Sequence, residues 1–155
     1  MSVAAKLKEC LDSNNVRYDV LTHPQVYTAQ DTAQAVHVPG NELAKSVVIK
    51  AGDKYALAVL PAPRKVDIER LRGKLGADAR LAHEDEFVQL FPGCEMGAMP
   101  PFGNLYGLDV YVDESLTQDD EIVFNAGTHV DAIRMKYADF ERLVHPTVAN
   151  FATSS

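Results

Sequence analysis

Two side chains stand where they could act on a bound substrate. Lys45 begins an apolar, β-branched run directly after a loop with a Pro-Gly pair, and from a strand end its ammonium could hold a carbonyl oxygen, a phosphate or a developing oxyanion. His129 follows Gly127 and Thr128 at the start of another strand, where it could carry a proton near neutral pH. The structural alternatives are a surface lysine at a strand end and a turn histidine bonded to nearby backbone. We treat both as candidate catalytic residues.

Residues 96–103, Met-Gly-Ala-Met-Pro-Pro-Phe-Gly, form an uncharged apolar stretch in the middle of an acidic chain. Two adjacent prolines exclude a long helix or a central strand, because proline lacks the N–H and clashes with the preceding turn. We therefore expect a rigid loop in which Gly97 and Gly103 allow a ligand or another backbone to approach closely. The apolar members of this loop would line a substrate pocket or pack in the core: Met96, Ala98, Met99, Pro100 and Phe102.

Other reactive side chains favour structural roles. Cys94 has no adjacent base in the sequence and is interpreted as a small buried hydrophobe. The acidic residues 119–121 are typical of a solvated turn. The remaining histidines show no pairing at zinc spacing and are expected at the surface or in caps: His23, His37, His83 and His145. We therefore expect no metal site and no cofactor, and we find neither a nucleotide-type phosphate loop nor a Gly-x-Ser-x-Gly motif.

Composition and charge describe an ordinary globular chain. Its 155 residues are 46% hydrophobic and 24% charged, which suits one domain with a substantial core. The formal charge of −7 argues against a protein that coats DNA, although Lys50, Arg64 and Lys65 could still meet a few phosphates or simply be solvated. No apolar run approaches the ~18–20 residues of a membrane span, and the start is not typical of a signal peptide. With two distant cysteines, we expect a cytoplasmic protein without a membrane partner.

Hydrophobic periodicity and turn residues predict short strands mixed with short helices. We expect strands at residues 18–21, 46–49, 55–60, 108–112, 122–125 and 130–135, with a hairpin at Gly52. We expect helices from a Ser2 cap to Asn14, from Thr28 to the Pro-Gly pair at 39–40, and over residues 67–71, 84–90 and 138–144. Residues 152–155 have the composition of a frayed tail. The pattern has no regular βαβ alternation and favours an α+β fold, one domain over residues 1–155, with a curled or closed mixed sheet.

Three segments, in this order and at these separations, resemble the YbaK/ProX family of aminoacyl-tRNA deacylases, which includes the editing domain inserted in bacterial prolyl-tRNA synthetases. They are the strand start at 44–50 with Lys45, the Gly-x-x-x-Pro loop from Gly97 to Pro101, and the segment 122–129 that ends at His129. The likeness covers about residues 20–146, nearly the whole chain. It implies a barrel-like mixed sheet surrounded by helices.

The resemblance also implies a role for each residue of the site. Lys45 would place the 3′ end of the substrate, while Gly97 and Pro101 would hold the ester and the terminal ribose through backbone groups that position the attacking water. Gly127 and Thr128 would belong to the substrate-binding surface. The ribose 2′-hydroxyl can take part in the proton transfer, so that positioning of the ester and the water can supply much of the catalysis. Family members often carry other residues at His129, so the resemblance does not imply a general base there.

The expected function is trans-editing, the hydrolysis of a mischarged aminoacyl-tRNA by a freestanding enzyme. A synthetase site cannot strongly reject an amino acid that differs by one methylene, a gap worth only ~1–3 kcal/mol, so a second sieve is useful. The expected partners are the 3′ acceptor end of an aminoacyl-tRNA, in particular tRNA(Pro) with a small non-cognate amino acid, and prolyl-tRNA synthetase. Two alternatives stay open: a non-catalytic module that binds aminoacyl-tRNA or a synthetase, and a hydrolase of a free small ester or thioester.

Overall fold

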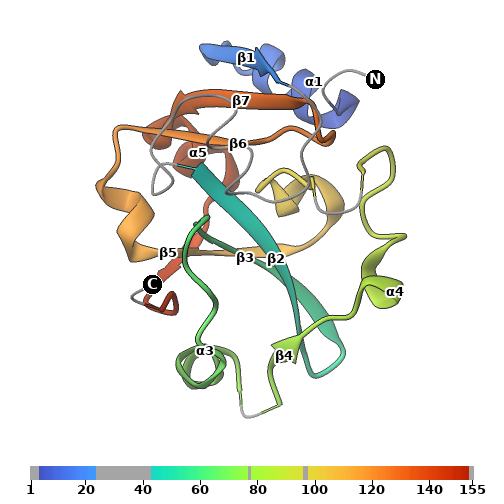
Figure 1. The fold of residues 1–155 in the computed structure, drawn as a ribbon, viewed down its shortest axis with the longest axis vertical. Coiled ribbons are helices and arrows are strands. Elements are labelled where there is room, and N and C mark those ends of the chain that lie inside the picture. The colour runs from blue at the N-terminus through green and yellow to red at the C-terminus, as the bar shows by residue number, and fades with distance from the viewer. Residues whose placement is uncertain (1–3, 24–42, 77, 96–97, 154–155) are drawn as a thin grey trace.

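One mixed sheet of eight strands organises the computed structural model, which describes residues 4–23, 43–76, 78–95 and 98–153. The order is β1-β7-β6-β2-β3-β5-β8, and β4 pairs with β2 beyond that path. The strands are β1 Tyr18–Thr22, β2 Leu43–Ala51, β3 Lys54–Pro61, β4 Arg80–Leu81, β5 Asp109–Asp113, β6 Glu121–Asn125, β7 Asp131–Lys136 and β8 Thr147–Ala149. Figure 1 shows β1, β7 and α1 (Ala5–Ser13) at one end of the molecule, and β4 and α3 (Ile68–Leu75) at the other.

The β2–β3 hairpin forms the centre of the sheet. Gly52 turns the chain with φ +62°, a conformation that glycine adopts at little cost. Successive side chains of a strand point to opposite faces of the sheet. Both faces of β3 are buried. From β3, Leu57 and Val59 enter the main core, whereas Ala58 and Leu60 enter a second apolar cluster with Leu71 of α3. Because β2 pairs with β3, the two faces of β2 also lie toward these two different apolar clusters.

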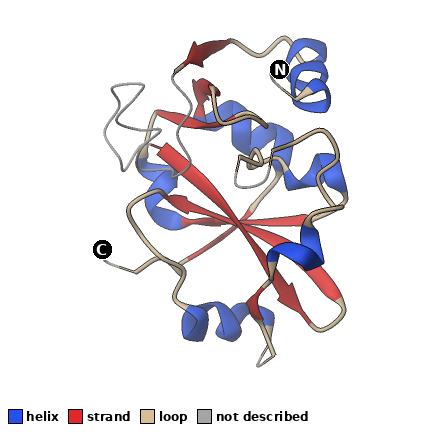
Figure 2. Ribbon diagram, turned by 45° about the vertical axis from the view of Figure 1, so that its right-hand side comes forward, coloured by secondary structure: helices blue, strands red, loops and turns tan. Residues whose placement is uncertain are grey.

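Helices cover the strands from the outside, as Figure 2 shows. Besides α1 and α3 they are α4 (Glu84–Phe87), α5 (Tyr137–Val144) and the 3-10 helices η2 (Gly103–Tyr106) and η3 (Glu114–Gln118). The main core takes Leu7 and Leu11 from α1 and Phe140 from α5. Among the described residues, no helix is long and apolar enough to cross a membrane.

The predicted α+β class with a curled mixed sheet is confirmed, and so are the predicted strands and the last helix, with shifts of a few residues. Three helix ends differ from the prediction. The first helix begins at Ala5 with Ala4 as its N-cap, so the cap expected at Ser2 is wrong. The helix expected over 67–71 continues through Gly73 to Leu75, because an interior glycine costs only about 1 kcal/mol. It ends instead at Gly76, with φ +121°. The helix expected over 84–90 is one turn, Glu84–Phe87. Ser2 and the helix expected from Thr28 lie outside the described residues.

The chain after α5 is ordered further than its composition indicates. β8 was not predicted, and it pairs in parallel with β5. Beyond it, Ala152 bridges to Val66 and is buried, so the frayed tail expected from residue 152 is wrong for residues 152 and 153. The reason is Asp113, whose carboxylate accepts hydrogen bonds from the backbone N–H groups of Phe151 and Ala152, both at 2.9 Å. A residue about 40 positions away thus fixes this segment, which no local pattern reveals.

Candidate active site

The proline loop and the turn after β6 are joined by backbone hydrogen bonds. The N–H of Gly127 donates to the carbonyl of Ala98 at 2.8 Å, and the N–H of Glu95 donates to the carbonyl of Gly127 at 2.7 Å. We call these contacts, together with the bond from Glu95 to His129 described next, the loop–turn clasp. Gly127 has φ +97°, and a Cβ there would lie 2.8 Å from the Cβ of Ala4. Glycine is therefore required at this position on both conformational and steric grounds.

The turn itself is held by side chains. The N–H of His129 donates to Oε1 of Glu95 at 2.6 Å. The hydroxyl of Thr128 donates to Oδ2 of Asp131 at 2.8 Å and accepts the N–H of Asp131 at 3.0 Å, and both side chains are buried. His129 is 7% exposed. The turn histidine is thus packed into the clasp, and its role as a proton carrier stays a prediction.

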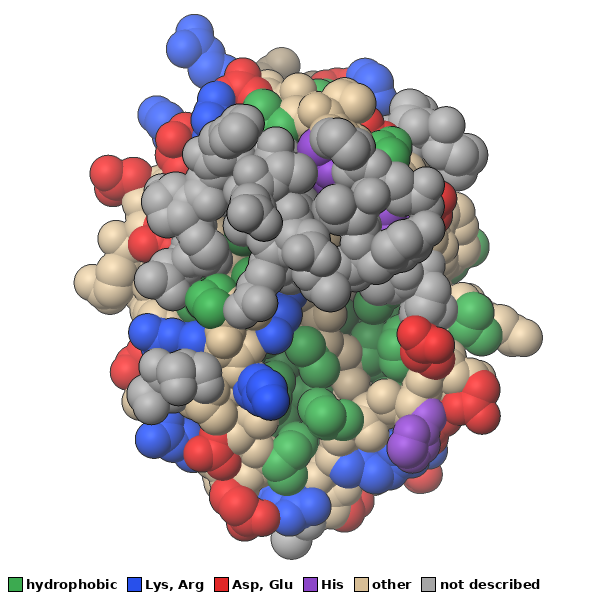
Figure 3. Space-filling view, viewed as in Figure 1, with side chains coloured by type: hydrophobic (Ala, Val, Ile, Leu, Met, Phe, Trp, Pro, Cys, Tyr) green, Lys and Arg blue, Asp and Glu red, His purple; other side chains and the backbone are tan. Residues whose placement is uncertain are grey.

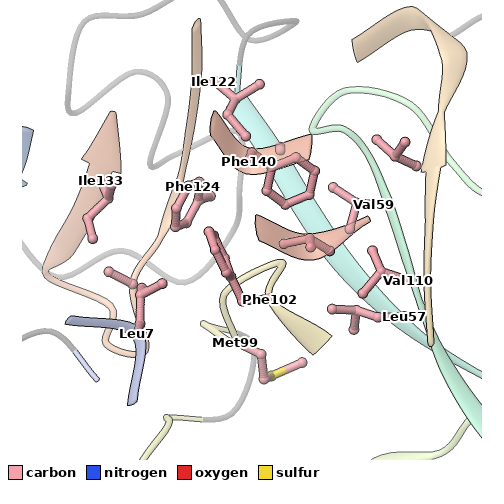
Figure 4. Close-up of a cluster of buried hydrophobic side chains, with 14 of the residues drawn as sticks. Leu7, Leu57, Val59, Met99, Phe102, Val110, Ile122, Phe124, Ile133 and Phe140 are labelled. Atoms are coloured by element: carbon pink, nitrogen blue, oxygen red, sulfur yellow. The ribbon is translucent and has the colours of Figure 1, made fainter. Parts of the chain in front are cut away.

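The apolar members of the loop pack inward. Phe102 is fully buried, and its ring centroid lies 5.7 Å from that of Phe124 and 5.5 Å from that of Phe140. Met99 is 7% exposed and joins the same cluster, which Figure 4 shows. Ala98, Pro100 and Pro101 are buried as well. The side chains of Met99 and Phe102 therefore take the packing role, while Met96 and Gly97 lie outside the described residues.

Lys45 occupies the third position of β2 in an environment unusual for a lysine. It pairs with Leu60 of β3, and residues paired across antiparallel strands share a face, so its side chain lies on the side of the second apolar cluster. The side chain is partly buried and makes no ion pair with a described residue. Burial lowers the pKa of the Lys45 ammonium below the ordinary lysine value, and the nearby charge of Lys65 lowers it further. The fold thus keeps a partly desolvated cation beside another cation.

Asn125, the last residue of β6, is a site residue that the sequence did not single out. β2 and β6 run in parallel with Ala44 opposite Phe124, so Lys45 is level with Asn125. Asn125 pairs with Ala132 of β7, whose cluster includes Leu43, so it shares the face of Lys45. Its Oδ1 is buried and has no hydrogen-bond partner among the described residues. A buried amide oxygen without a partner is costly and rare, which marks it as a candidate ligand contact.

The structure brings two of the sequence signals to neighbouring strands, β2 and β6, and bonds the proline loop to the turn that follows β6. Lys45 is level with Asn125, and Gly127 follows two residues later, a spacing of about 7 Å along an extended chain. The loop is bonded to Gly127 and so begins close to that point. The side chains of Met99 and Phe102, however, enter the core on the opposite face of β2 from Lys45. Any contact between the loop and the ammonium must therefore come from parts of the loop other than these two side chains.

Among the described residues, the other reactive side chains show no arrangement that favours a different catalytic or metal site. Cys94 Sγ lies 3.3 Å from the hydroxyl of Tyr106, and burial raises the pKa of its thiol, so it is a weak nucleophile. Among the described residues, no three side chains of His, Cys, Asp or Glu come together as a metal site. Glu95 is the second residue that sequence reasoning missed, because its role depends on a turn 34 residues away.

Known proteins are similar to this chain over most of its length. A family model, the aminoacyl-tRNA editing domain, matches residues 23–143. The chain is similar to the "Multifunctional Ser/Thr-tRNA deacylase ProXp-y" of Escherichia coli (strain K12), with 30% identity over 152 residues, 94% of this chain and 90% of that protein. It is also similar to part of the proline–tRNA ligase of Thermosipho africanus, with 31% identity over 81 residues, 52% of this chain and 14% of the ligase.

Solved structures share the fold. One is described as a candidate trans-editing enzyme for prolyl-tRNA synthetase; it superposes with a TM-score of 0.84 at 24% identity and covers 97% of both chains. Another, the hypothetical protein APE2540, has a TM-score of 0.86 at 19% identity, over 96% of this chain and 99% of that one. At these identities the likeness concerns the fold alone.

Proposed function

We propose that this chain, which belongs to the aminoacyl-tRNA editing domain family, hydrolyses the ester bond of mischarged aminoacyl-tRNA in trans. The observation that carries the proposal is the Lys45 ammonium, partly desolvated and without a described counter-ion, on the strand beside the one that leads into the loop–turn clasp. A cation kept in this state at a cost in stability is typical of a functional group. Its site of action is then the cytoplasm, where aminoacyl-tRNA is made.

The reaction needs placement more than a strong nucleophile, since the aminoacyl ester is already activated. Water adds to the ester carbonyl, the oxyanion forms, and the 3′ oxygen of the terminal ribose leaves with a proton. Lys45 is assigned to hold the 3′ end and the developing negative charge. Backbone groups of the loop, with Gly97 and Pro101, are assigned to position the ester and the water. Holding both partners in register can supply ~7–11 kcal/mol of the barrier.

Asn125 is assigned a hydrogen bond to a hydroxyl of the substrate. Its Oδ1 can only accept, and beside a lysine a neutral donor is favoured over a second cation. The terminal ribose and the amino acids serine and threonine both offer such a hydroxyl. Gly127, Thr128 and His129 are assigned to the turn that supports the loop, with His129 as the open candidate for proton transfer.

The substrate we propose is tRNA(Pro) with a small non-cognate amino acid, with prolyl-tRNA synthetase as the functional partner. Similarity to parts of proline–tRNA ligases supports the link to tRNA(Pro). The name of the Escherichia coli relative adds serine and threonine on tRNA to the candidates. All of these amino acids are small, which agrees with a sieve by size.

A panel of mischarged tRNAs tests the proposal. Deacylation is measured for tRNA(Pro) charged with alanine, serine, threonine, cysteine or proline, for other tRNAs with serine or threonine, and for free aminoacyl esters. We expect turnover of at least one small amino acid on tRNA and none of prolyl-tRNA(Pro). If the protein hydrolyses none of these substrates, it is a binding module and not an enzyme. If it hydrolyses free aminoacyl esters as fast as aminoacyl-tRNA, tRNA is not part of its function.

A further inference from the structure

Three cations near the site have no counter-ion among the described residues, although the chain is acidic. Lys45, Arg64 and Lys65 make no ion pair or side-chain hydrogen bond with any described residue. By contrast, carboxylates lie within 4.0 Å of five arginines, of which Arg70 lines the same cavity as Arg64 and the others lie elsewhere: Arg70, Arg72, Arg80, Arg134 and Arg142. With 22 acidic residues against 15 basic ones, counter-ions are available to this chain. Counted over the described residues, their absence here leaves a local excess of positive charge.

The three cations lie in one region of the molecule. Lys65 is close enough to Lys45 to lower the pKa of its ammonium, and Arg64 precedes Lys65 in the chain. Arg64 lines a cavity of about 530 Å³ together with Arg70, Ser115 and Gln118. Figure 3 shows Lys and Arg side chains next to apolar ones at the middle of this face. We call Lys45, Lys65, Arg64 and the cavity beside Arg70 the basic track.

The backbone under the basic track is fixed. The N–H of Lys65 donates to the hydroxyl of Thr153 at 3.0 Å, and the N–H of Thr153 donates to the carbonyl of Lys65 at 2.8 Å. Arg64 donates its N–H to the carbonyl of Pro61 at 3.0 Å. The carboxylates in the cavity are already engaged, Asp113 with backbone N–H groups and Glu114 with Asn150. The backbone of Arg64 and Lys65 is therefore fixed, and neither side chain forms an ion pair with these two acids.

We propose that the basic track binds the phosphates of the acceptor stem of the substrate tRNA, with Lys65 next to the terminal nucleotide and Arg64 further along the strand. The inference rests on the proposed function, because it starts from a 3′ ester held at Lys45. A row of like charges repels itself, and a polyanion relieves that repulsion at every member, whereas a single small anion would occupy only one position. Contacts of this kind position the nucleic acid and carry no sequence information.

The test compares Arg64→Gln and Lys65→Gln with Lys54→Gln as the matched control. Lys54 is an exposed lysine at the other end of the β2–β3 hairpin, paired with Ala51, whereas Lys45 pairs with Leu60. For each variant, kcat/KM is measured over a range of salt with two substrates. One is the best mischarged tRNA of the panel, and the other is the same amino acid esterified to adenosine, which lacks the stem phosphates.

We expect each track variant to lower kcat/KM on tRNA about three- to tenfold at low salt and to reduce the slope of log(kcat/KM) against log salt by about 0.7–0.9. The loss on aminoacyl-adenosine should be several times smaller, and Lys54→Gln should match the wild type on both substrates. Equal losses on the two substrates, or an unchanged salt slope, overturn the basic track while the deacylase itself stands. A wild-type protein that cleaves neither substrate overturns the proposed function and the track together.

Discussion

At the scale of single residues, Lys45 shows a conflict between stability and function. Burial and the charge of Lys65 lower the pKa of its ammonium, so the fold disfavours the charged form. The charge therefore costs stability below the folded pKa, and this cost fades as pH rises toward the ordinary lysine value of 10.5. The folded protein would be more stable without this charge. Because Lys45 lies beside the loop–turn clasp, an action on the substrate best explains why the charge is present.

Lys45→Met tests this conflict, because methionine keeps the length of the side chain without the charge. We expect kcat/KM to fall about 10²–10³-fold, as for the loss of an oxyanion-stabilising donor. We expect the melting temperature at pH 7 to stay equal or rise, and the gain to shrink as pH approaches 10. Lys54→Met, at an exposed position, should change neither quantity. A clear loss of stability in Lys45→Met would show that the ammonium has a structural partner.

Asn125→Ala separates a binding role from a structural one at the neighbouring position. Because Oδ1 has no partner among the described residues, removing this oxygen breaks no hydrogen bond to them, and the unfolding midpoint in urea should change little. A hydrogen bond to a substrate hydroxyl is worth about 0.5–1.5 kcal/mol, so kcat/KM should fall about three- to tenfold. The measurement pairs urea unfolding with deacylation rates. Full activity in the alanine variant would remove Asn125 from the site.

At the scale of elements, the loop–turn clasp unites segments that the sequence marks separately. Periodicity and turn residues predicted the strands, and the two prolines predicted a rigid loop at 96–103, of which the structure describes 98–103. The pairing of Gly127 with Ala98 could not be predicted in this way, because it depends on contacts about 30 residues apart. The same holds for Asn125: its relation to Lys45 follows from a parallel register between β2 and β6, two strands that are distant in the chain. Local patterns identify elements, and long-range register decides which side chains meet.

Gly127→Ala tests the clasp, with Gly107→Ala as a matched control. Both glycines have positive φ, +97° and +76°, so alanine pays backbone strain of about 1–2 kcal/mol at either position. Only at Gly127 does the new Cβ also meet Ala4 at 2.8 Å, whereas nothing lies within 4 Å at Gly107. We expect Gly127→Ala to be the less stable of the two and to lose most deacylase activity. Gly107→Ala should lose stability alone, as judged by thermal unfolding and rates below the melting temperature. Equal deacylase activity in the two variants would show that the loop–turn clasp is not needed for catalysis.

At the scale of the whole molecule, Asp113 ties the end of the chain to the sheet. It is 2% exposed and accepts hydrogen bonds from Ser115 and from the backbone of Phe151 and Ala152. Burial alone would raise the pKa of this carboxyl, but the hydrogen bonds outweigh burial and hold it below its ordinary value. A lowered carboxyl pKa stabilises the fold above the unfolded value of about 4, and this contribution is lost as pH falls through the folded pKa. The same segment carries Thr153, which fixes the backbone of Lys65, so its order also supports the basic track.

Asp113→Ala should therefore destabilise the protein by more than about 2 kcal/mol at pH 7, because two buried N–H groups lose their acceptor. Asp113→Asn keeps one acceptor oxygen without the charge and should fall between the wild type and the alanine variant. The difference between wild type and Asp113→Asn should narrow as pH is lowered below about 4, since the Asp113 carboxylate of the unfolded chain then takes up a proton before that of the folded protein does. Urea unfolding at several pH values measures both effects. A difference that stays constant from pH 7 to pH 3 would mean that the charge of Asp113 contributes nothing and that the tail is held by packing alone.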